Sequence, residues 1–215
     1  MKKFFRKLGS FFGYINRFII ACLLVIFSLI LYIPFRILFP IKVLGRKNLK
    51  NQKTGQLIAC NHYSNFDVWM LQVLFFKRFW LRKFLAKKEL GKNCFSRTFV
   101  GGLGAIFIDR NNLDIKAMKE VLSELKKGKN IIIFPEGTRN KSGSEDLQDI
   151  KSGVIFFADR AKCNIVPMII MHRIKPFHKN QIIIGEGYKV TNSGKAGQQI
   201  ERDILNDKFQ SLREM

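Results

Sequence analysis

Residues 57–67 have the sequence LIACNHYSNFD, in which an apolar run leads directly into a histidine and an aspartate. The run Leu57–Cys60 has no charged position, as expected of a strand buried on both faces of a sheet. Residues 65–79 are rich in Trp, Leu and Phe, and they predict a helix. A strand that passes through a short loop into a helix is typical of an α/β sheet. This junction therefore places His62 in the loop and Asp67 in the first helical turn.

The same alternation continues to the end of the chain. Strands are predicted at Leu57–Cys60, Ala105–Ile108, Ile131–Phe134, Ile165–Ile170 and Ile182–Ile184. Helices are predicted at Asn65–Phe79, Asn112–Lys127, Ser152–Ala161 and Gly194–Arg213. Because short buried strands alternate with helical patterns, we expect one α/β domain over residues 46–215.

Residues 1–45 have a different character. The run Phe18–Ile33 is apolar except at Ser28, and it is shorter than the roughly 20 residues that a full membrane span needs. It is compatible with a marginal span, a helical hairpin in one leaflet, or a soluble core helix. A cleaved signal peptide is disfavoured, because no small-x-small cleavage site follows the run. We expect residues 1–45 to form a membrane-associated helical segment, with the basic residues near Met1 on the cytoplasmic side.

The composition of the chain limits the classes of binding partner but does not select one of them. The 215-residue chain carries a formal net charge of +22, which favours a polyanion such as nucleic acid, an anionic bilayer or a phosphorylated small molecule. No cysteine stands in a CxxC pair, and no Cys/His cluster has zinc spacing. The cysteines are therefore predicted to be buried or free thiols in a reducing compartment, and no metal is expected. These cysteines are Cys22, Cys60, Cys94 and Cys163.

His62 and Asp67 suggest acid–base chemistry. A carboxylate that is hydrogen-bonded to one ring nitrogen fixes the tautomer of a histidine, and the other nitrogen is then free to take a proton from a hydroxyl. A substrate alcohol would serve as the attacking group, so no serine or cysteine nucleophile is required. The alternative is structural: Ser64-x-x-Asp67 resembles a helix capping box, and His62 would be an ordinary loop histidine.

Two further stretches place cations after predicted strands. In residues 134–139, FPEGTR, a Pro-Glu-Gly turn exposes backbone N–H groups, and Thr138 and Arg139 add donors for a phosphate. Residues 104–110, GAIFIDR, end a strand at Arg110, which would converge with Arg139 on one phosphate. A tight turn with a surface arginine and a capped strand end are the structural alternatives. Pro167 lies inside a predicted strand and indicates an edge or a bulge.

Together these blocks resemble the glycerolipid acyltransferase family. Order and spacing agree over about residues 55–170, and the ordered set is far more specific than any one block. The matching blocks are the His-x-x-x-x-Asp of His62 and Asp67, residues 104–110, residues 134–139, the Val-Pro of residues 166–167, the Lys-x-Glu-Leu of residues 87–90 and the Lys-x-Gly of residues 151–153.

The resemblance implies a fold and a reaction. It implies a mixed sheet flanked by helices, in which His62 is a general base and Asp67 orients it. The base would activate the sn-2 hydroxyl of lysophosphatidic acid for direct attack on the thioester of acyl-CoA or acyl carrier protein. No metal or bound cofactor is implied. Anionic lipids of the cytoplasmic membrane are the implied surroundings, with the catalytic domain on the cytoplasmic face.

The resemblance also implies how the acceptor is held. Arg139, Arg110 and Lys87 would bind the substrate phosphate. Three neighbours of Arg139 would shape the same site, namely Glu136, Gly137 and Thr138. The nearest rival function is acyl transfer to another lysolipid, such as a lyso-ornithine lipid or a glycolipid. A non-catalytic binder of anionic lipid or nucleic acid is the remote alternative, and the sequence has no nucleic-acid-binding motif.

Overall fold

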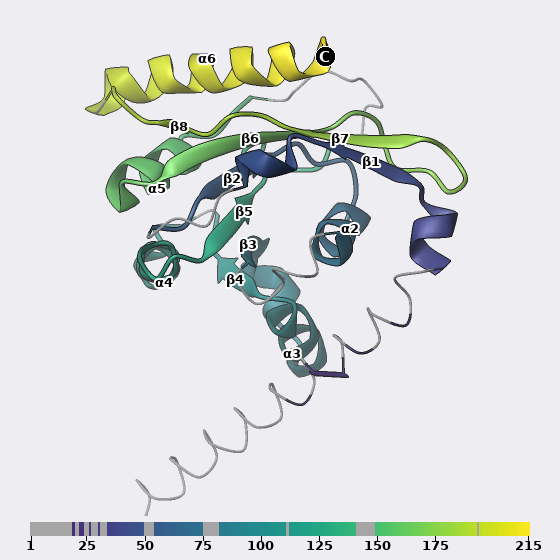
Figure 1. Cartoon of the computed structure of the whole chain (residues 1–215). Helices are drawn as coiled ribbons and strands as arrows, with labels where there is room; N and C mark the ends of the chain where they lie inside the picture. The colour runs from purple at the N-terminus through teal and green to yellow at the C-terminus, as the bar shows by residue number, and fades with distance from the viewer. Residues whose placement is uncertain are drawn as a thin grey trace, which may run out of the picture.

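The computed structural model describes residues 19, 22, 23, 26, 30, 34–49, 54–74, 82–110, 112–140, 149–192 and 194–215. In this part of the chain, strands and helices alternate along most of the sequence (Figure 1). The strands are β1 (Ile41–Leu44), β2 (Leu57–Cys60), β3 (Arg82–Lys87), β4 (Ala105–Ile108), β5 (Asn130–Ile133), β6 (Asn164–Ile170), β7 (Asn180–Ile184) and β8 (Tyr188–Lys189). The helices are α2 (Phe66–Leu74), α3 (Cys94–Gly102), α4 (Ile115–Lys126), α5 (Gly153–Ala161) and α6 (Gly194–Arg213), with 3-10 turns η1 (Arg46–Asn48) and η3 (Lys88–Gly91).

The strands form one mixed sheet in the order β1-β7-β6-β2-β5-β3-β4, and β8 pairs with β6. The central strands β6, β2, β5, β3 and β4 are mutually parallel, whereas β7 and β8 run antiparallel to β6. Leu57 of β2 stands opposite Ile131 on one side and Ile165 on the other. The expected mixed α/β sheet is confirmed.

Helices cover both faces of this sheet, which explains the unbroken apolar strands. Leu57 and Ala59 belong to a core shared with α4, α5 and α6. Ile58 and Cys60, which point to the opposite face, belong to a second core with α2 and Phe35. Because successive side chains of a strand alternate between faces, a strand between two helical layers is apolar at every position.

The predicted strands are all present, with ends that differ by at most two residues, but three strands (β1, β3 and β8) and one helix (α3) were missed. Charged residues occupy both ends of β3 and interrupt its apolar pattern, and α3 has no buried residue to give it a period. The missed strand β1 pairs with β7, so the sheet includes residues 41–44 of the segment expected to be separate. Of the helix expected at 65–79, residues 66–74 are helical and residues 75–79 lie outside the described residues.

Pro167 lies on β6, which is an internal strand rather than an edge strand. Its carbonyl accepts a hydrogen bond from the N–H of Gly185 (2.8 Å), so this side of Pro167 faces the connection between β7 and β8. The ladder with β7 begins at Met168, and the ladder with β8 ends at Ile165. The missing N–H of proline therefore coincides with a gap in pairing, which is how an internal strand accommodates it.

The apolar run Phe18–Ile33 lies largely outside the described residues. Residues 34–38 are helical, and within them Phe35 is buried, with its ring edge-on to Trp69 of α2 at a centroid distance of 5.0 Å. In the described part of the chain, no helix has both the length and the apolar character needed to cross a bilayer.

Glu201 fastens α6 to the segment that follows β8. Its carboxylate is buried and accepts hydrogen bonds from the backbone N–H groups of Thr191 and Asn192, both at 2.9 Å, and from their side chains. Burial on its own raises the pKa of Glu201, but these hydrogen bonds outweigh it and hold the pKa below its ordinary value.

We therefore predict that Glu201→Gln destabilises the protein in a pH-dependent manner. A depressed pKa contributes stability above the unfolded pKa of about 4.3, and that stability is lost as the pH falls through the lower folded pKa. At neutral pH the substitution should lower the free energy of unfolding by about 1–2 kcal/mol. The difference from wild type should shrink below about pH 4. Urea unfolding followed by circular dichroism, with the exposed Asp203→Asn as control, checks this, and a pH-independent difference would contradict it.

Candidate active site

Four adjacent parallel strands bring the predicted site residues to one edge of the sheet. The order β2-β5-β3-β4 means that the carboxyl ends of these strands lie side by side. His62 follows β2, residues 134–139 follow β5, Lys87 ends β3 and Arg110 follows β4. Ligand sites of open α/β sheets lie at this edge, because the loops beyond the carboxyl ends of the strands meet there.

His62 and Asp67 form the expected pair. The Nδ1 atom of His62 lies 2.9 Å from Oδ2 of Asp67, whose side chain is fully buried, whereas the side chain of His62 is 14% exposed. An ionised carboxylate can only accept hydrogen bonds, so Nδ1 carries the proton. Nε2 then holds a lone pair, as a general base requires.

Asp67 also folds the loop that carries His62. Its Oδ2 accepts hydrogen bonds from the backbone N–H groups of Tyr63 (2.8 Å) and Ser64 (2.7 Å), and its Oδ1 accepts one from the hydroxyl of Ser64 (3.1 Å). The hydroxyl of Ser64 in turn accepts from the N–H of Phe66 at the start of α2. Asp67 therefore caps the start of α2, and the same carboxylate makes the contact with His62 that the catalytic interpretation requires.

Neighbours outside the motif hold His62 from three further directions. The ring of Phe134 stacks on the imidazole, with a centroid distance of 4.0 Å and an interplanar angle of 20°. The backbone N–H of Asn140 donates to the carbonyl of His62 (2.8 Å). The buried amide of Asn61 donates to the carbonyl of Ile170 (2.9 Å) and accepts from its N–H (2.7 Å), which ties the end of β2 to the end of β6.

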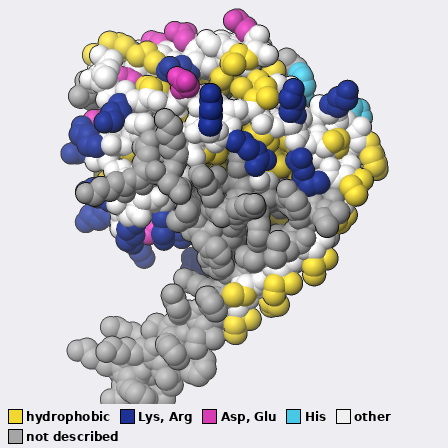
Figure 2. Space-filling model, in the orientation of Figure 1, with side chains coloured by type: hydrophobic (Ala, Val, Ile, Leu, Met, Phe, Trp, Pro, Cys, Tyr) yellow, Lys and Arg dark blue, Asp and Glu magenta, His cyan; other side chains and the backbone are white. Residues whose placement is uncertain are grey.

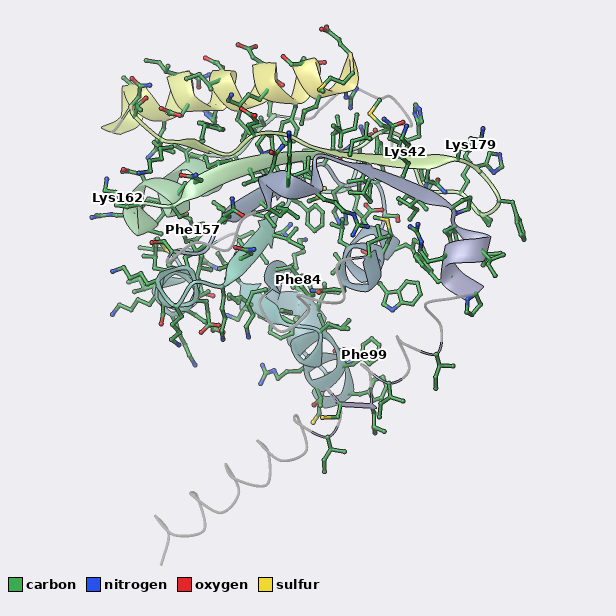
Figure 3. The ribbon with its side chains drawn as sticks, in the orientation of Figure 1. Lys42, Phe84, Phe99, Phe157, Lys162 and Lys179 are labelled. Atoms are coloured by element: carbon green, nitrogen blue, oxygen red, sulfur yellow. The ribbon has the colours of Figure 1, made fainter. Side chains whose placement is uncertain are left out.

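A pocket of about 940 Å³ opens beside His62 and has two kinds of wall. The polar wall carries Lys87, Arg110, Thr138 and Arg139. The apolar wall comes from α2, β3 and α3, and it includes Trp69, Phe84, Ala86, Phe99, Val100 and Leu103. Figure 3 labels two of these residues, Phe84 on β3 and Phe99 on α3. The pocket therefore suits a molecule with an anionic end and a long apolar end.

Arg110 is aimed at the turn that follows β5. Its guanidinium donates to the carbonyl of Gly137. Burial lowers the pKa of Arg110 and the charge of Glu89 raises it, but an arginine stays charged at neutral pH. Gly137 has a φ of 71°, and a Cβ atom there would lie 2.9 Å from Cε of Lys151. This turn therefore needs glycine for its backbone conformation, whereas the flexible end of Lys151 can shift away from a Cβ atom.

Cys60 is the cysteine nearest to His62 in the sequence, and it is fully buried. Burial raises the pKa of its thiol well above the ordinary value, and the negative charges of Asp67 and Glu136 raise it further. Since the thiolate is the reactive form, this thiol is a poor nucleophile. In the described part of the chain, no three His, Cys, Asp or Glu side chains gather as metal ligands would.

Most of the residues proposed from the sequence lie together. His62, Lys87, Arg110, Gly137, Thr138 and Arg139 line the pocket, and Asp67 lies behind His62. Glu136 does not line the pocket, because its side chain is turned into the protein and is only 3% exposed. The sequence did not predict the stacking of Phe134 on His62, the hydrogen bonds between Asn61 and Ile170, or the contribution of α3 to the apolar wall of the pocket. The apolar residue at the end of β5 and the asparagine beside His62 were the available signals.

Comparison with known proteins places this geometry in a family. A family model described as acyltransferase matches residues 40–171, the part of the chain that holds the whole site. Proteins named 1-acyl-sn-glycerol-3-phosphate acyltransferase match from Helicobacter pylori (32% identity over 63% of this chain and 55% of the relative) and Bacillus subtilis (34%, over 59% and 60%). A relative of the same name from Saccharomyces cerevisiae is 29% identical over 72% of this chain and 48% of its own length. The chain thus spans about half to three-fifths of the length of these curated relatives.

The fold is shared with a solved structure. The crystal structure of the 1-acyl-sn-glycerophosphate acyltransferase from Thermotoga maritima superposes with a TM-score of 0.63, over 97% of this chain and 89% of that one. At 18% identity this likeness establishes the fold alone. The family model, in contrast, matches more than half of the chain and includes the His62–Asp67 pair, the turn after β5 and Arg110. This protein belongs to the acyltransferase family.

Proposed function

We propose that this protein transfers a fatty acyl group from acyl-CoA or acyl carrier protein to the sn-2 hydroxyl of 1-acyl-glycerol-3-phosphate. The product is phosphatidic acid, an intermediate of phospholipid biosynthesis. The observation that carries the proposal is the pairing of His62 with Asp67 in a pocket that has cationic and apolar walls. The names of the relatives from several organisms agree with this reaction.

In the proposed mechanism Nε2 of His62 takes the proton of the sn-2 hydroxyl while the hydroxyl oxygen attacks the thioester carbonyl. The C–S bond then breaks, and the imidazolium returns the proton to the leaving thiolate. Asp67 stabilises the imidazolium through the 2.9 Å contact with Nδ1. No acyl-enzyme is required, in agreement with the buried, protonated thiol of Cys60. No metal or bound cofactor takes part, and the acyl donor is a co-substrate.

The acceptor phosphate is proposed to bind to the polar wall. Arg139, Arg110 and Lys87 all line the pocket, and a dianionic phosphate forms charge-assisted hydrogen bonds with such groups. Gly137 and Thr138 line the same wall and offer backbone and hydroxyl groups. Glu136, which is turned inward, is proposed to support the turn rather than to touch the phosphate.

The protein is proposed to work at the cytoplasmic membrane, with the catalytic domain on the cytoplasmic face and residues 1–45 as its membrane-associated part. The lipid acceptor and the formal net charge of +22 support this location, because basic residues are attracted to anionic lipids.

Another lysolipid, such as a lyso-ornithine lipid or a glycolipid, is the second candidate acceptor. Three cationic side chains in one wall favour a phosphate monoester over these, because it carries the larger charge. Competition between lysophosphatidic acid and the other lysolipids separates the two. A non-catalytic binding protein would not need the pairing of His62 with Asp67.

Substitution of His62 and Asp67 tests their proposed catalytic roles. We predict that purified wild-type protein in detergent forms phosphatidic acid from lysophosphatidic acid and an acyl thioester, and that His62→Ala lowers kcat by about 10³-fold or more. Asp67→Asn should lower kcat by about 10²-fold or more, because it no longer stabilises the imidazolium. Asp203→Asn, which changes an exposed carboxylate of α6, is the matched control. Turnover of a folded His62→Ala variant above about a tenth of wild type would contradict the role of His62 as base.

Substitution of Arg139 tests the proposed phosphate site. Arg139→Ala should raise the apparent KM for lysophosphatidic acid by about tenfold or more, because a hydrogen bond to a charged group is worth about 1.5–3 kcal/mol. The apparent KM for the acyl donor should change much less. Arg160→Ala, at an exposed position of α5, serves as control. Steady-state kinetics with each substrate varied in turn checks this, and equal effects on both substrates would count against a phosphate role.

A further inference from the structure

An exposed surface at one end of the sheet combines apolar and basic side chains. It lies where the connection between β6 and β7 meets the segment that leads into β1. We call it the β6–β7 surface, and its members are Ile37, Leu38, Arg173, Lys175, Phe177 and Lys179. Figure 2 shows basic, histidine and hydrophobic side chains close together at the upper right, and Figure 3 labels Lys42 and Lys179 at this end of the sheet.

The apolar members of this surface are unusually exposed. Phe177 is 76% exposed, Ile37 is 70% exposed and Leu38 is 38% exposed. A single exposed apolar side chain is ordinary, but several on adjoining segments indicate contact with an apolar partner. These segments do adjoin, because the backbone N–H of Phe177 donates to the carbonyl of Leu38 at 2.6 Å.

The loop holds Phe177 in this position. Asn180 accepts a hydrogen bond from the N–H of Lys175 (3.0 Å) and donates to the carbonyls of Lys175 (2.9 Å) and His178 (2.8 Å). Phe177 has a φ of 58°, a conformation that a bulky residue adopts only when its surroundings enforce it. The conformation of the loop therefore enforces the exposure of the Phe177 ring.

The charge around these apolar side chains has one sign. Residues 34–49 and 171–181 contain no Asp or Glu. Arg173, Lys175 and Lys179 are all exposed. Exposed apolar side chains next to basic side chains match the interface of an anionic leaflet, where aromatic and aliphatic groups enter the headgroup layer and cations meet lipid phosphates.

The β6–β7 surface is also connected to the pocket. Residues 34–38 expose Ile37 and Leu38 on one side, and on the other side they pack the ring of Phe35 against Trp69, which lines the pocket. Residue 34 also follows directly on the apolar run Phe18–Ile33, so a leaflet that holds this run lies next to residue 34.

We propose that the β6–β7 surface docks on a leaflet that contains anionic phospholipid. Phe177, Ile37 and Leu38 enter the interfacial layer, while the three basic side chains bind lipid phosphates. The choice of a bilayer as the partner rests on the proposed function, in which the acceptor is a lipid. In a protein with a soluble substrate, the same apolar and basic side chains would fit the surface of an acidic protein. When the β6–β7 surface docks, the side of residues 34–38 that exposes Ile37 and Leu38 lies on the leaflet. The pocket then stays next to the membrane that supplies the acceptor.

A position-specific probe tests this in the full chain. Cys22 and Cys94 are replaced by serine, because Cys60 and Cys163 are buried, and an environment-sensitive fluorophore is attached through Phe177→Cys. Lys162→Cys, at an exposed position at the end of α5, is the control. The labelled protein is added to phosphatidylcholine vesicles with and without phosphatidylglycerol, and nitroxide-bearing lipids quench any probe in the headgroup layer.

We expect the probe at position 177, but not the one at 162, to shift to shorter emission wavelength and to be quenched when phosphatidylglycerol is present. Lys175→Glu with Lys179→Glu should lower the ratio of docked to undocked protein by about 25-fold or more, since one lysine near an anionic leaflet contributes about fivefold. Lys162→Glu should leave that ratio unchanged. Equal quenching at the two positions, or a probe at 177 that responds only to an acidic protein, would overturn the proposal.

The probe is read without substrate, so this result is independent of catalysis. Active protein with an unquenched probe at 177 would refute the docking surface and leave the proposed function standing. A protein whose probe at 177 is quenched but which has no activity would support the docking surface and refute the proposed function.

Discussion

The site depends on the need to compensate one buried carboxylate. An ionised Asp67 without exposure to water would cost several kcal/mol if it were left without partners. The loop meets this need by wrapping two backbone N–H groups, the hydroxyl of Ser64 and Nδ1 of His62 around it. That wrapping determines where the imidazole stands and which of its nitrogens faces the pocket. The spacing of five positions between His62 and Asp67 therefore gives the chain the length it needs to turn back onto the carboxylate.

Strand order explains why separate motifs make one site. β5 is inserted between β2 and β3, so the turn of residues 134–139 lies next to His62 although more than 70 residues separate them in sequence. Arg110 reaches the carbonyl of Gly137 from β4, across the end of β3. All four strands are parallel, which means that each loop leaves the sheet at the same edge. A change in the direction of one strand would send its residues to the opposite edge.

The sequence predicts the strands that are buried on both faces and the loops that follow them, because each has an unmixed local pattern. It does not predict β3, whose Arg82, Lys83 and Lys87 interrupt the apolar pattern, or α3, which buries no residue. It also places Phe134 correctly at the end of a strand without indicating that its ring stacks on His62. Such a contact joins β5 to the loop after β2, so it follows from strand order and not from any local spacing.

The aromatic cluster beside α2 links the proposed chemistry to the proposed membrane contact. Phe35 and Phe39 pack with Phe66 and Trp69 at centroid distances of 5.0–6.0 Å. Phe66 begins the helix that carries Asp67, and Trp69 lines the pocket. The segment proposed to rest on the leaflet is therefore packed directly against α2, the helix that carries Asp67. Because packed side chains in a protein core transmit displacement, we expect the proposed docking of residues 34–38 to set the position of the pocket relative to the bilayer through this aromatic cluster.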